Sequence, residues 1–360
     1  MPGKQLDSKP MESKTLLNLS SFVVALIIIT ITIGSLKAQE DQIKIFSELV
    51  NIDVVVKDRS GQRIKGLQKS DFDLEEDGVR QEITHFRAAE RPLKIVLLFD
   101  TSFSMQDVLP VLKQEASKLV GGMTQEDRLM IASFDCNINW HTIWVDRDHA
   151  LEATNGITPG PLLCHHVAYS PPTPRSTSGV VIADSNTYVY EAFRDILERF
   201  QDGSESIAIL AFTDGLDTAT RFASNRQKRA GLGEEMAKLA EESWVTVFPV
   251  HPKTEQFKII GASPARRPFP STISIKPKYS DAGHEFVSKI TKATGGEAFE
   301  FTTQQSLATA IQEALANMRS QYSLAYRPSR PENKGAFHRI KIRTTRPGFV
   351  TIAREGYRRP

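Results

Sequence analysis

KIVLLFDTSFSM, at residues 94–105, is the stretch that decides the fold expected for this chain of 360 residues. Its five apolar residues in a row, with a charge at each end, predict a strand buried on both faces, as at the centre of a parallel sheet. Apolar residues at helical spacing over residues 108–120 predict a helix directly after it. In open α/β sheets ligands bind beyond the carboxyl ends of the strands. We therefore expect Asp100, Ser102 and Ser104 in such a crevice.

The side chains at this strand end favour a hard cation. One carboxylate and two neutral hydroxyls make an oxygen-only set, which suits Mg²⁺ or Ca²⁺ better than softer metals. Two further candidates follow: Thr187 opens a helix after a long loop, and Asp214 follows the apolar strand 207–212 in Thr-Asp-Gly. The alternative is that the serines only cap the helix while Asp100 accepts backbone N–H bonds. Capping would not explain a second strand that ends on Thr-Asp-Gly.

The D-x-S-x-S pattern of residues 100–104, at a strand-to-helix junction, resembles the von Willebrand factor A-type (VWA) fold and its metal-ion-dependent adhesion site. Over residues 44–358 the chain looks like a bacterial exported VWA-related family. The other motifs that carry this resemblance are Gly66–Phe72, Glu76–Gly78, Thr213–Asp217, Thr294–Gly296, Gln321–Tyr322 and Arg354–Tyr357.

The resemblance implies an α/β fold, with a doubly wound, mostly parallel sheet that carries helices on both faces. It implies a divalent cation, usually Mg²⁺ with Ca²⁺ or Mn²⁺ as alternatives. Its ligands would be Asp100, Ser102, Ser104, Thr187 and Asp214, some of them through water. The open position on the cation would accept an Asp or Glu carboxylate of a partner protein. The expected function is cation-dependent protein–protein binding or adhesion, without catalysis, and the resemblance does not name the ligand.

Two departures from the family pattern lead to an alternative function. Phe103 stands where the family often has glycine, and Asn186 precedes Thr187 where glycine is common. If the backbone at Phe103 needs positive φ, a phenylalanine there would displace the Ser104 hydroxyl and weaken cation binding. The protein would then be a metal-independent structural component of the cell envelope. Otherwise Phe103 would be an apolar contact for a partner on the rim of the site.

A metal-dependent hydrolase is the third hypothesis. It would need a general base, but His141, His165 and His166 have no sequence context that joins them to the site. The sequence also has no glycine-rich phosphate loop and no nucleophile elbow. The run Cys164-His165-His166 does not match a recognised zinc spacing.

The first 38 residues have the order of a secretory signal. Three lysines precede an apolar run at residues 22–33, and small residues follow up to Ala38, where we expect cleavage. The stretch 15–36 is long enough to span a bilayer, so an uncleaved N-terminal anchor is the alternative. Either way we expect an exported protein, periplasmic, in the cell envelope or secreted, that meets a membrane only through such an anchor.

Charge and cysteine content add two further expectations. Lysine plus arginine (45) nearly balances aspartate plus glutamate (43), and aromatic residues are not interleaved with basic clusters, so nothing indicates a nucleic-acid partner. Cys136 and Cys164 are the only cysteines. In an exported protein two thiols are more often paired than free, but the sequence cannot show that they come close enough to bridge.

Both ends of the chain have the period-two alternation of strands. We expect a signal or anchor at 1–38, the first part of a β module at 43–90, the VWA domain at 91–320 and strands that complete the β module at 321–358. The strands at either end are too few to be stable alone, so we expect one β-sandwich, with independent modules as the alternative. Residues 79–86 should pair with residues 71–75 across a turn, and the acids of 71–77 should lie on a solvated face.

Overall fold

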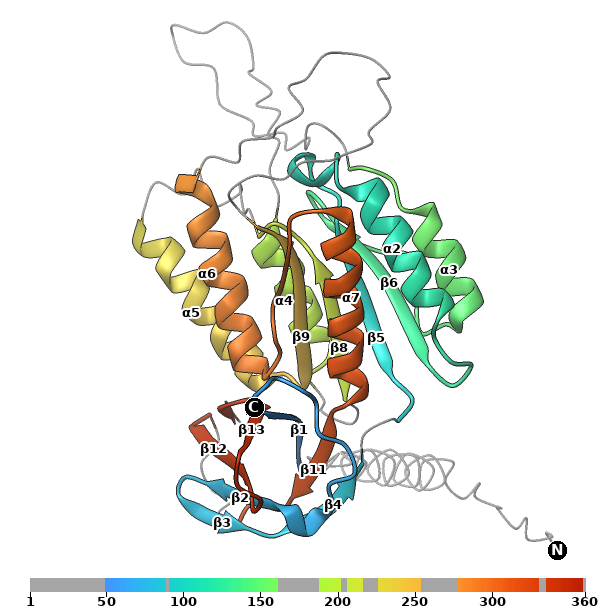
Figure 1. Ribbon diagram of the computed structural model, residues 1–360. Helices are drawn as coiled ribbons and strands as arrows, with labels where there is room; N and C mark the ends of the chain where they lie inside the picture. Colours follow the sequence, from blue (N-terminus) through green and yellow to red (C-terminus); the bar gives the residue numbers. More distant parts are fainter. Residues whose placement is uncertain are drawn as a thin grey trace, which may run out of the picture. The chain divides into compact units, whose positions relative to one another are not determined.

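The structure is a computed structural model that describes residues 49–88, 91–160, 188–201, 206–215, 226–253, 277–329 and 335–358. Three sheets account for its strands (Figure 1). The predicted signal or anchor segment lies outside the described residues. Among the residues described, no helix is both long enough and apolar enough to cross a membrane.

The central sheet has six strands in the order β10-β9-β8-β5-β6-β7. These strands are β5 (Lys94–Asp100), β6 (Arg128–Phe134), β7 (Ile138–Trp140), β8 (Ile207–Phe212), β9 (Val245–Pro252) and β10 (Phe299–Phe301). All neighbours are parallel except β7, which pairs antiparallel with β6. Strands β8 and β9 are buried along their whole length, because helices cover both faces of the sheet.

The helices are α2 (Leu109–Gly121), α3 (Arg147–Gly156), α4 (Val189–Arg199), α5 (Arg226–Glu242), α6 (Pro277–Thr294) and α7 (Gln304–Arg319). Helices α2, α3 and α7 pack on one face of the sheet and α4, α5 and α6 on the other, with a separate apolar core on each side. The prediction of a doubly wound sheet is thus confirmed. A 3₁₀ turn, η2 (Phe103–Met105), lies between β5 and α2.

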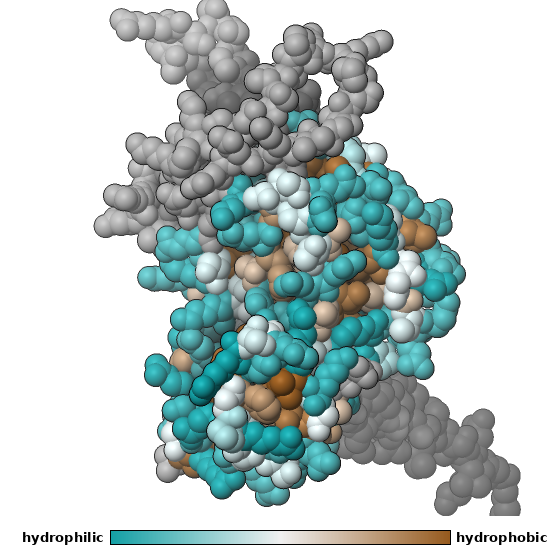
Figure 2. All heavy atoms as spheres, in the orientation of Figure 1, coloured by the Kyte–Doolittle hydropathy of each residue, from teal (hydrophilic) through white to brown (hydrophobic). Residues whose placement is uncertain are grey.

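Two four-stranded antiparallel sheets form the sandwich, in the orders β13-β1-β11-β4 and β14-β12-β2-β3. Their strands are β1 (Val50–Asp58), β2 (Phe72–Glu76), β3 (Val79–Gln81), β4 (Ile83–Arg87), β11 (Tyr322–Tyr326), β12 (Phe337–Thr344), β13 (Phe349–Ala353) and β14 (Gly356–Arg358); a 3₁₀ turn, η1 (Lys69–Asp71), precedes β2. Ile52, Leu74, Tyr322 and Ile340 share one apolar core. Each sheet therefore takes strands from both ends of the chain, as predicted. The face in Figure 2 is mostly hydrophilic, with apolar residues visible over the sandwich strands.

The predicted strand 79–86 is wrong in its second half. β3 pairs with β2, but β4 pairs with β11 in the other sheet. β3 ends at Gln81 and β4 begins at Ile83, so the chain passes from one sheet to the other at Glu82, although the buried, exposed, buried order of these three residues is that of a single strand. Alternation within a segment cannot distinguish a continuous strand from one that changes sheets.

The prediction that the acids of 71–77 lie on a solvated face is wrong for two of them. Asp71 and Glu76 are buried, while Asp73 and Glu75 are half-buried and Asp77 is exposed. Asp71 lies in an ion pair with Arg346. Glu76 is on the inner face of β2, on the same side as Phe72 and Leu74.

Candidate metal site

The candidate site lies at the topological switch point of the central sheet. Strand β5 has β6 on one side and β8 on the other, although β8 comes later in the chain. Phe99 pairs with Phe212, so Asp100 and Asp214 leave the carboxyl ends of adjacent strands. Ligands of open α/β sheets bind at this point, because the loops on either side diverge and leave a crevice.

Asp100 is fully buried, and both of its carboxylate oxygens accept hydrogen bonds. One carboxylate oxygen accepts the backbone N–H of Ser102 at 3.0 Å, and the other accepts the Thr213 hydroxyl at 2.7 Å. Burial and the negative charge of Asp214 raise the pKa of Asp100 to about 8. Two carboxylates that hinder each other's ionisation in a buried position favour a cation between them.

The two serines lie together beside Asp100. The hydroxyl oxygens of Ser102 and Ser104 are 3.1 Å apart. The backbone of Phe103 is 3₁₀-helical, and Asp77 is the only non-glycine residue at positive φ in the described part of the chain. The condition under which Phe103 would displace the Ser104 hydroxyl is therefore not met.

Thr213 is a site residue that sequence reasoning missed. Its buried hydroxyl donates to Asp100 and accepts the N–H of Gly215 at 2.9 Å, so it joins the two acidic loops. Gly215 has a φ of +71°, which lets the chain turn directly after Asp214. The signal was present, since Thr213 is the first residue of Thr-Asp-Gly, but the sequence does not show which group its hydroxyl contacts.

Thr187 lies outside the described residues, but the residue after it is anchored beside the site. The N–H of Tyr188 donates to the carbonyl of Asp135 at 3.0 Å. The Asp135 side chain lies 3.5 Å from the Thr101 hydroxyl, and the Thr101 carbonyl accepts the N–H of Gly160 at 2.8 Å. The start of α4 is thus fixed to the same loops that hold Asp100.

The residues considered for soft metals or a general base are not brought together by the described structure. His141 lies 2.7 Å from the Ser133 hydroxyl, and burial lowers the pKa of its imidazole. Cys136 is disulfide-bonded. The other cysteine, Cys164, lies outside the described residues, as do His165 and His166.

The donor set fits a hard divalent cation. Two carboxylates and two hydroxyls come together without a nitrogen or sulfur donor among the described residues of the site, a composition that suits Mg²⁺, Ca²⁺ or Mn²⁺. The strand order, the antiparallel edge strand and the acidic switch point together define a fold of the VWA type.

The chain is similar in fold to solved VWA-type structures. They include BatB from Bacteroides thetaiotaomicron (19% identity, 63% of this chain and 98% of that one, TM-score 0.41). The match to a von Willebrand factor type A protein from Catenulispora acidiphila has 12% identity and a TM-score of 0.41, and it covers 81% of this chain and 75% of that one. The match to proximal thread matrix protein 1 from the mussel byssus, solved with zinc in its metal-ion-dependent adhesion motif, has 12% identity and a TM-score of 0.34. It covers 64% of this chain and 48% of that one. No known family profile and no curated protein matches the sequence.

Proposed function

We propose that this protein binds a partner protein through a divalent cation held at the switch point. Asp100, Ser102, Ser104, Thr187 and Asp214 would hold the ion, some of them through water. The proposed ion is Mg²⁺, with Ca²⁺ and Mn²⁺ as alternatives. The partner would present an Asp or Glu carboxylate, and the protein itself would catalyse no reaction.

The observation that carries this proposal is the burial of Asp100 beside Asp214. Burial first, and then the negative charge of Asp214, raise the pKa of Asp100, and a bound cation would offset both of these costs of ionising the carboxylate. The hydroxyls of Ser102 and Ser104 bring no negative charge, so two carboxylates would leave the ion able to attract a third from a partner.

The N-terminal segment supports an exported location for this binding. Its charged, apolar and small-residue regions follow the order of a secretory signal. We propose that the protein acts in the periplasm, in the cell envelope or after secretion, and that an uncleaved segment would hold it at a membrane.

Calorimetric titration of Mg²⁺ tests the ion. We expect one Mg²⁺ per chain, and a loss of affinity of more than about 100-fold in Asp214→Ala, since even residues that only support metal ligands contribute 10- to 100-fold. Asp195→Ala, which removes an exposed carboxylate on α4, is the matched control and should bind normally. Unchanged Mg²⁺ binding in folded Asp214→Ala would contradict the proposal.

A pull-down from envelope extract tests the partner. We expect bound proteins to be recovered in Mg²⁺ by the wild type and by Asp195→Ala. They should be lost in EDTA and in Asp214→Ala. Recovery of the same proteins from the chelated sample would favour the metal-independent structural role.

A further inference from the structure

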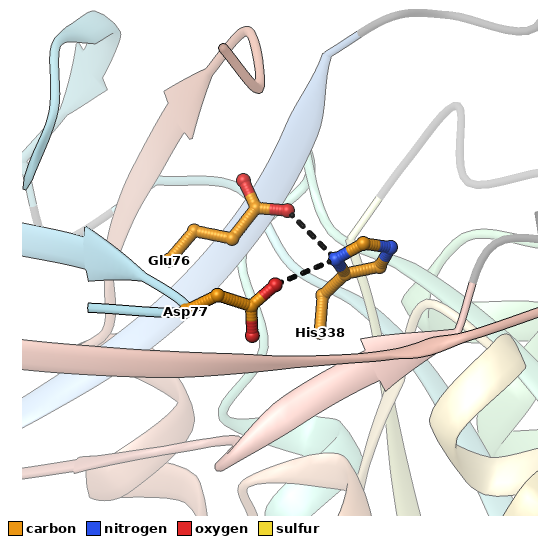
Figure 3. Close-up of side chains that lie close together, drawn as sticks. All are labelled: Glu76, Asp77 and His338. Carbon is orange, nitrogen blue, oxygen red and sulfur yellow. Dashed lines mark hydrogen bonds and ion pairs between the residues drawn. The ribbon is translucent and has the colours of Figure 1, made fainter. Parts of the chain in front are cut away.

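Three side chains of the sandwich converge at a place that the proposed function does not use. Glu76 ends β2, Asp77 lies in the hairpin turn after it, and His338 lies on β12 (Figure 3). The Nδ1 of His338 is 2.9 Å from Asp77 Oδ2 and 3.3 Å from Glu76 Oε1. One potential ligand atom from each side chain lies within 4.8 Å of the other two.

The surrounding structure holds these groups in place. Asp77 exchanges hydrogen bonds with the backbone of Arg339: its N–H donates to the carbonyl at 2.9 Å, and its Oδ1 accepts the N–H at 2.8 Å. The Tyr357 hydroxyl donates to Glu76 Oε1 at 3.0 Å, and the Tyr357 ring lies 5.4 Å from the His338 ring. Outer contacts of this kind orient the ligands of protein metal sites.

The charge of the cluster is not balanced by the residues around it. Glu76 is only 5% exposed, and its Oε2 accepts no well-formed hydrogen bond among the described residues; the buried Tyr326 hydroxyl, which interacts with Glu76, is a neutral group and brings no positive charge. In the described part of the chain, His338 is the only basic side chain within 4 Å of either carboxylate. A buried carboxylate that is incompletely paired is costly, so a bound cation would stabilise the sandwich here.

We propose that Glu76, Asp77 and His338 form a second metal site that takes Zn²⁺ or another divalent ion of the first transition row. This site offers one nitrogen and two oxygens as ligands, whereas the switch point offers only oxygens. An imidazole ligand favours Zn²⁺ and other first-row transition ions over Mg²⁺ and Ca²⁺. Ligands at 2.0–2.2 Å from a tetrahedral Zn²⁺ are separated by about 3.3 Å, close to the observed nitrogen–oxygen distances. Asp77 is exposed and leaves room for water as a fourth ligand.

The competing explanation is that the three side chains form only a hydrogen-bonded triad. In that case a proton on His338 Nδ1 is shared between Asp77 and Glu76, and the cluster needs no ion. A metal ion would replace that proton, so the two arrangements exclude each other and a titration separates them.

Zn²⁺ alone is the probe, titrated into the full chain in saturating Mg²⁺. We expect one Zn²⁺ bound at this site with a Kd below roughly 10 µM and a higher melting temperature in Zn²⁺. Glu76→Gln and His338→Gln should each weaken binding at least about tenfold. His149→Gln is the control, because it removes another histidine–carboxylate pair, that of His149 with Asp146, 2.7 Å apart.

Two further variants keep the outcome decisive. If His338→Gln fails to fold, Asp77→Asn changes only the exposed ligand and should still lose Zn²⁺. Asp214→Ala should keep this Zn²⁺ site while it loses Mg²⁺, so failure here is distinct from failure of the proposed function. No Zn²⁺ binding by the wild type, or equal binding by folded Glu76→Gln and Asp77→Asn, would show a hydrogen-bonded triad only.

Discussion

At the scale of single residues, neutral hydroxyls and buried charges set the geometry of the switch point. Asp100 is oriented by Thr213 and by the N–H of Ser102, so its carboxylate is fixed by groups that are not themselves charged. Because a hydroxyl can donate and accept at the same time, the single side chain of Thr213 links the loop of Asp100 to the loop of Gly215.

Replacing Thr213 with valine tests this link. The change keeps the shape but removes the hydroxyl that donates to Asp100 Oδ2 and leaves the N–H of Gly215 without its hydroxyl acceptor, while the Ser102 N–H still donates to Asp100 Oδ1. We expect a loss of about 2 kcal/mol in the free energy of unfolding and weaker Mg²⁺ binding. Urea unfolding and calorimetry measure both. Thr309→Val on the exposed face of α7 is the control, and equal effects of the two changes would argue against a special role for Thr213.

Asp127 is a second residue whose charge the structure uses. It is fully buried and accepts hydrogen bonds from the Leu93 N–H at 2.7 Å and from Arg319 at 2.8 Å. Burial alone would raise the pKa of Asp127, but the bonds from Arg319 and Leu93 lower it below its ordinary value. Its stabilisation is therefore present above the unfolded-state pKa of about 3.9, and is lost as the pH falls through the lower folded-state pKa.

We expect Asp127→Asn to lose about 3 kcal/mol of stability at neutral pH, because Arg319 is left without its partner. The variant should also lose less stability than the wild type when the pH falls below 4, since it lacks this carboxylate. Unfolding free energies measured against pH check both points. Asp148→Asn, on the surface of α3, should leave the wild-type profile intact.

At the scale of elements, the Thr-Gly-Gly turn after α6 joins the central sheet to the sandwich. Gly295 has a φ of +75°, and a Cβ at this position would lie 2.2 Å from the backbone nitrogen of Arg354. A Cβ on Gly296 would lie 1.8 Å from the carbonyl oxygen of Val247. The turn needs glycine because two other backbones approach it, in addition to its role in ending the helix.

Gly296→Ala tests this close approach. We expect a loss of about 3 kcal/mol, since Val247 is in strand β9 and its backbone cannot move without disturbing the sheet. Gly233→Ala on α5 is the matched control, because a Cβ there would meet nothing within 4 Å. The control should be stabilised by about 0.5–1 kcal/mol, since alanine favours the helix. Thermal and urea unfolding compare the two, and a neutral Gly296→Ala would contradict this account.

At the scale of the whole molecule, the sandwich holds the two ends of the chain together and contacts the central α/β part. Arg91 pairs with Asp53 at 3.0 Å, and Lys57 pairs with Glu297 at 2.6 Å. Buried Arg354 donates to the carbonyls of Ala240 and Ser243 at the end of α5. These contacts join the sandwich to several elements of the α/β part.

A chain that ends at Ser320 tests whether the N-terminal strands need the C-terminal ones. It lacks β11 to β14, so β1 loses both of its neighbours and β2 loses β12. We expect amides of β1 and β2 to exchange rapidly with solvent, while those of β5 and β8 stay protected by the central sheet. Hydrogen exchange measures both regions in one experiment. Retained protection in β1 would show that the two parts of the sandwich fold independently.

The central sheet was the part most open to prediction. Continuous apolar runs such as residues 94–100 mark a strand buried on both faces without reference to any other segment, and Asp100 follows from the end of that run. The turn at Glu82, the burial of Glu76 and the role of Thr213 were not predictable, because each depends on a strand or loop distant in the sequence.

The sequence by itself determined the alternation of elements, the acidic strand ends and the oxygen-only character of the switch point, since these depend on side-chain type and local spacing. Tertiary structure alone decided which strands from the two ends pair, and it alone placed His338 between Glu76 and Asp77. The physical reason is that pairing across more than 250 residues is set by the packing of a shared core, which no local pattern encodes.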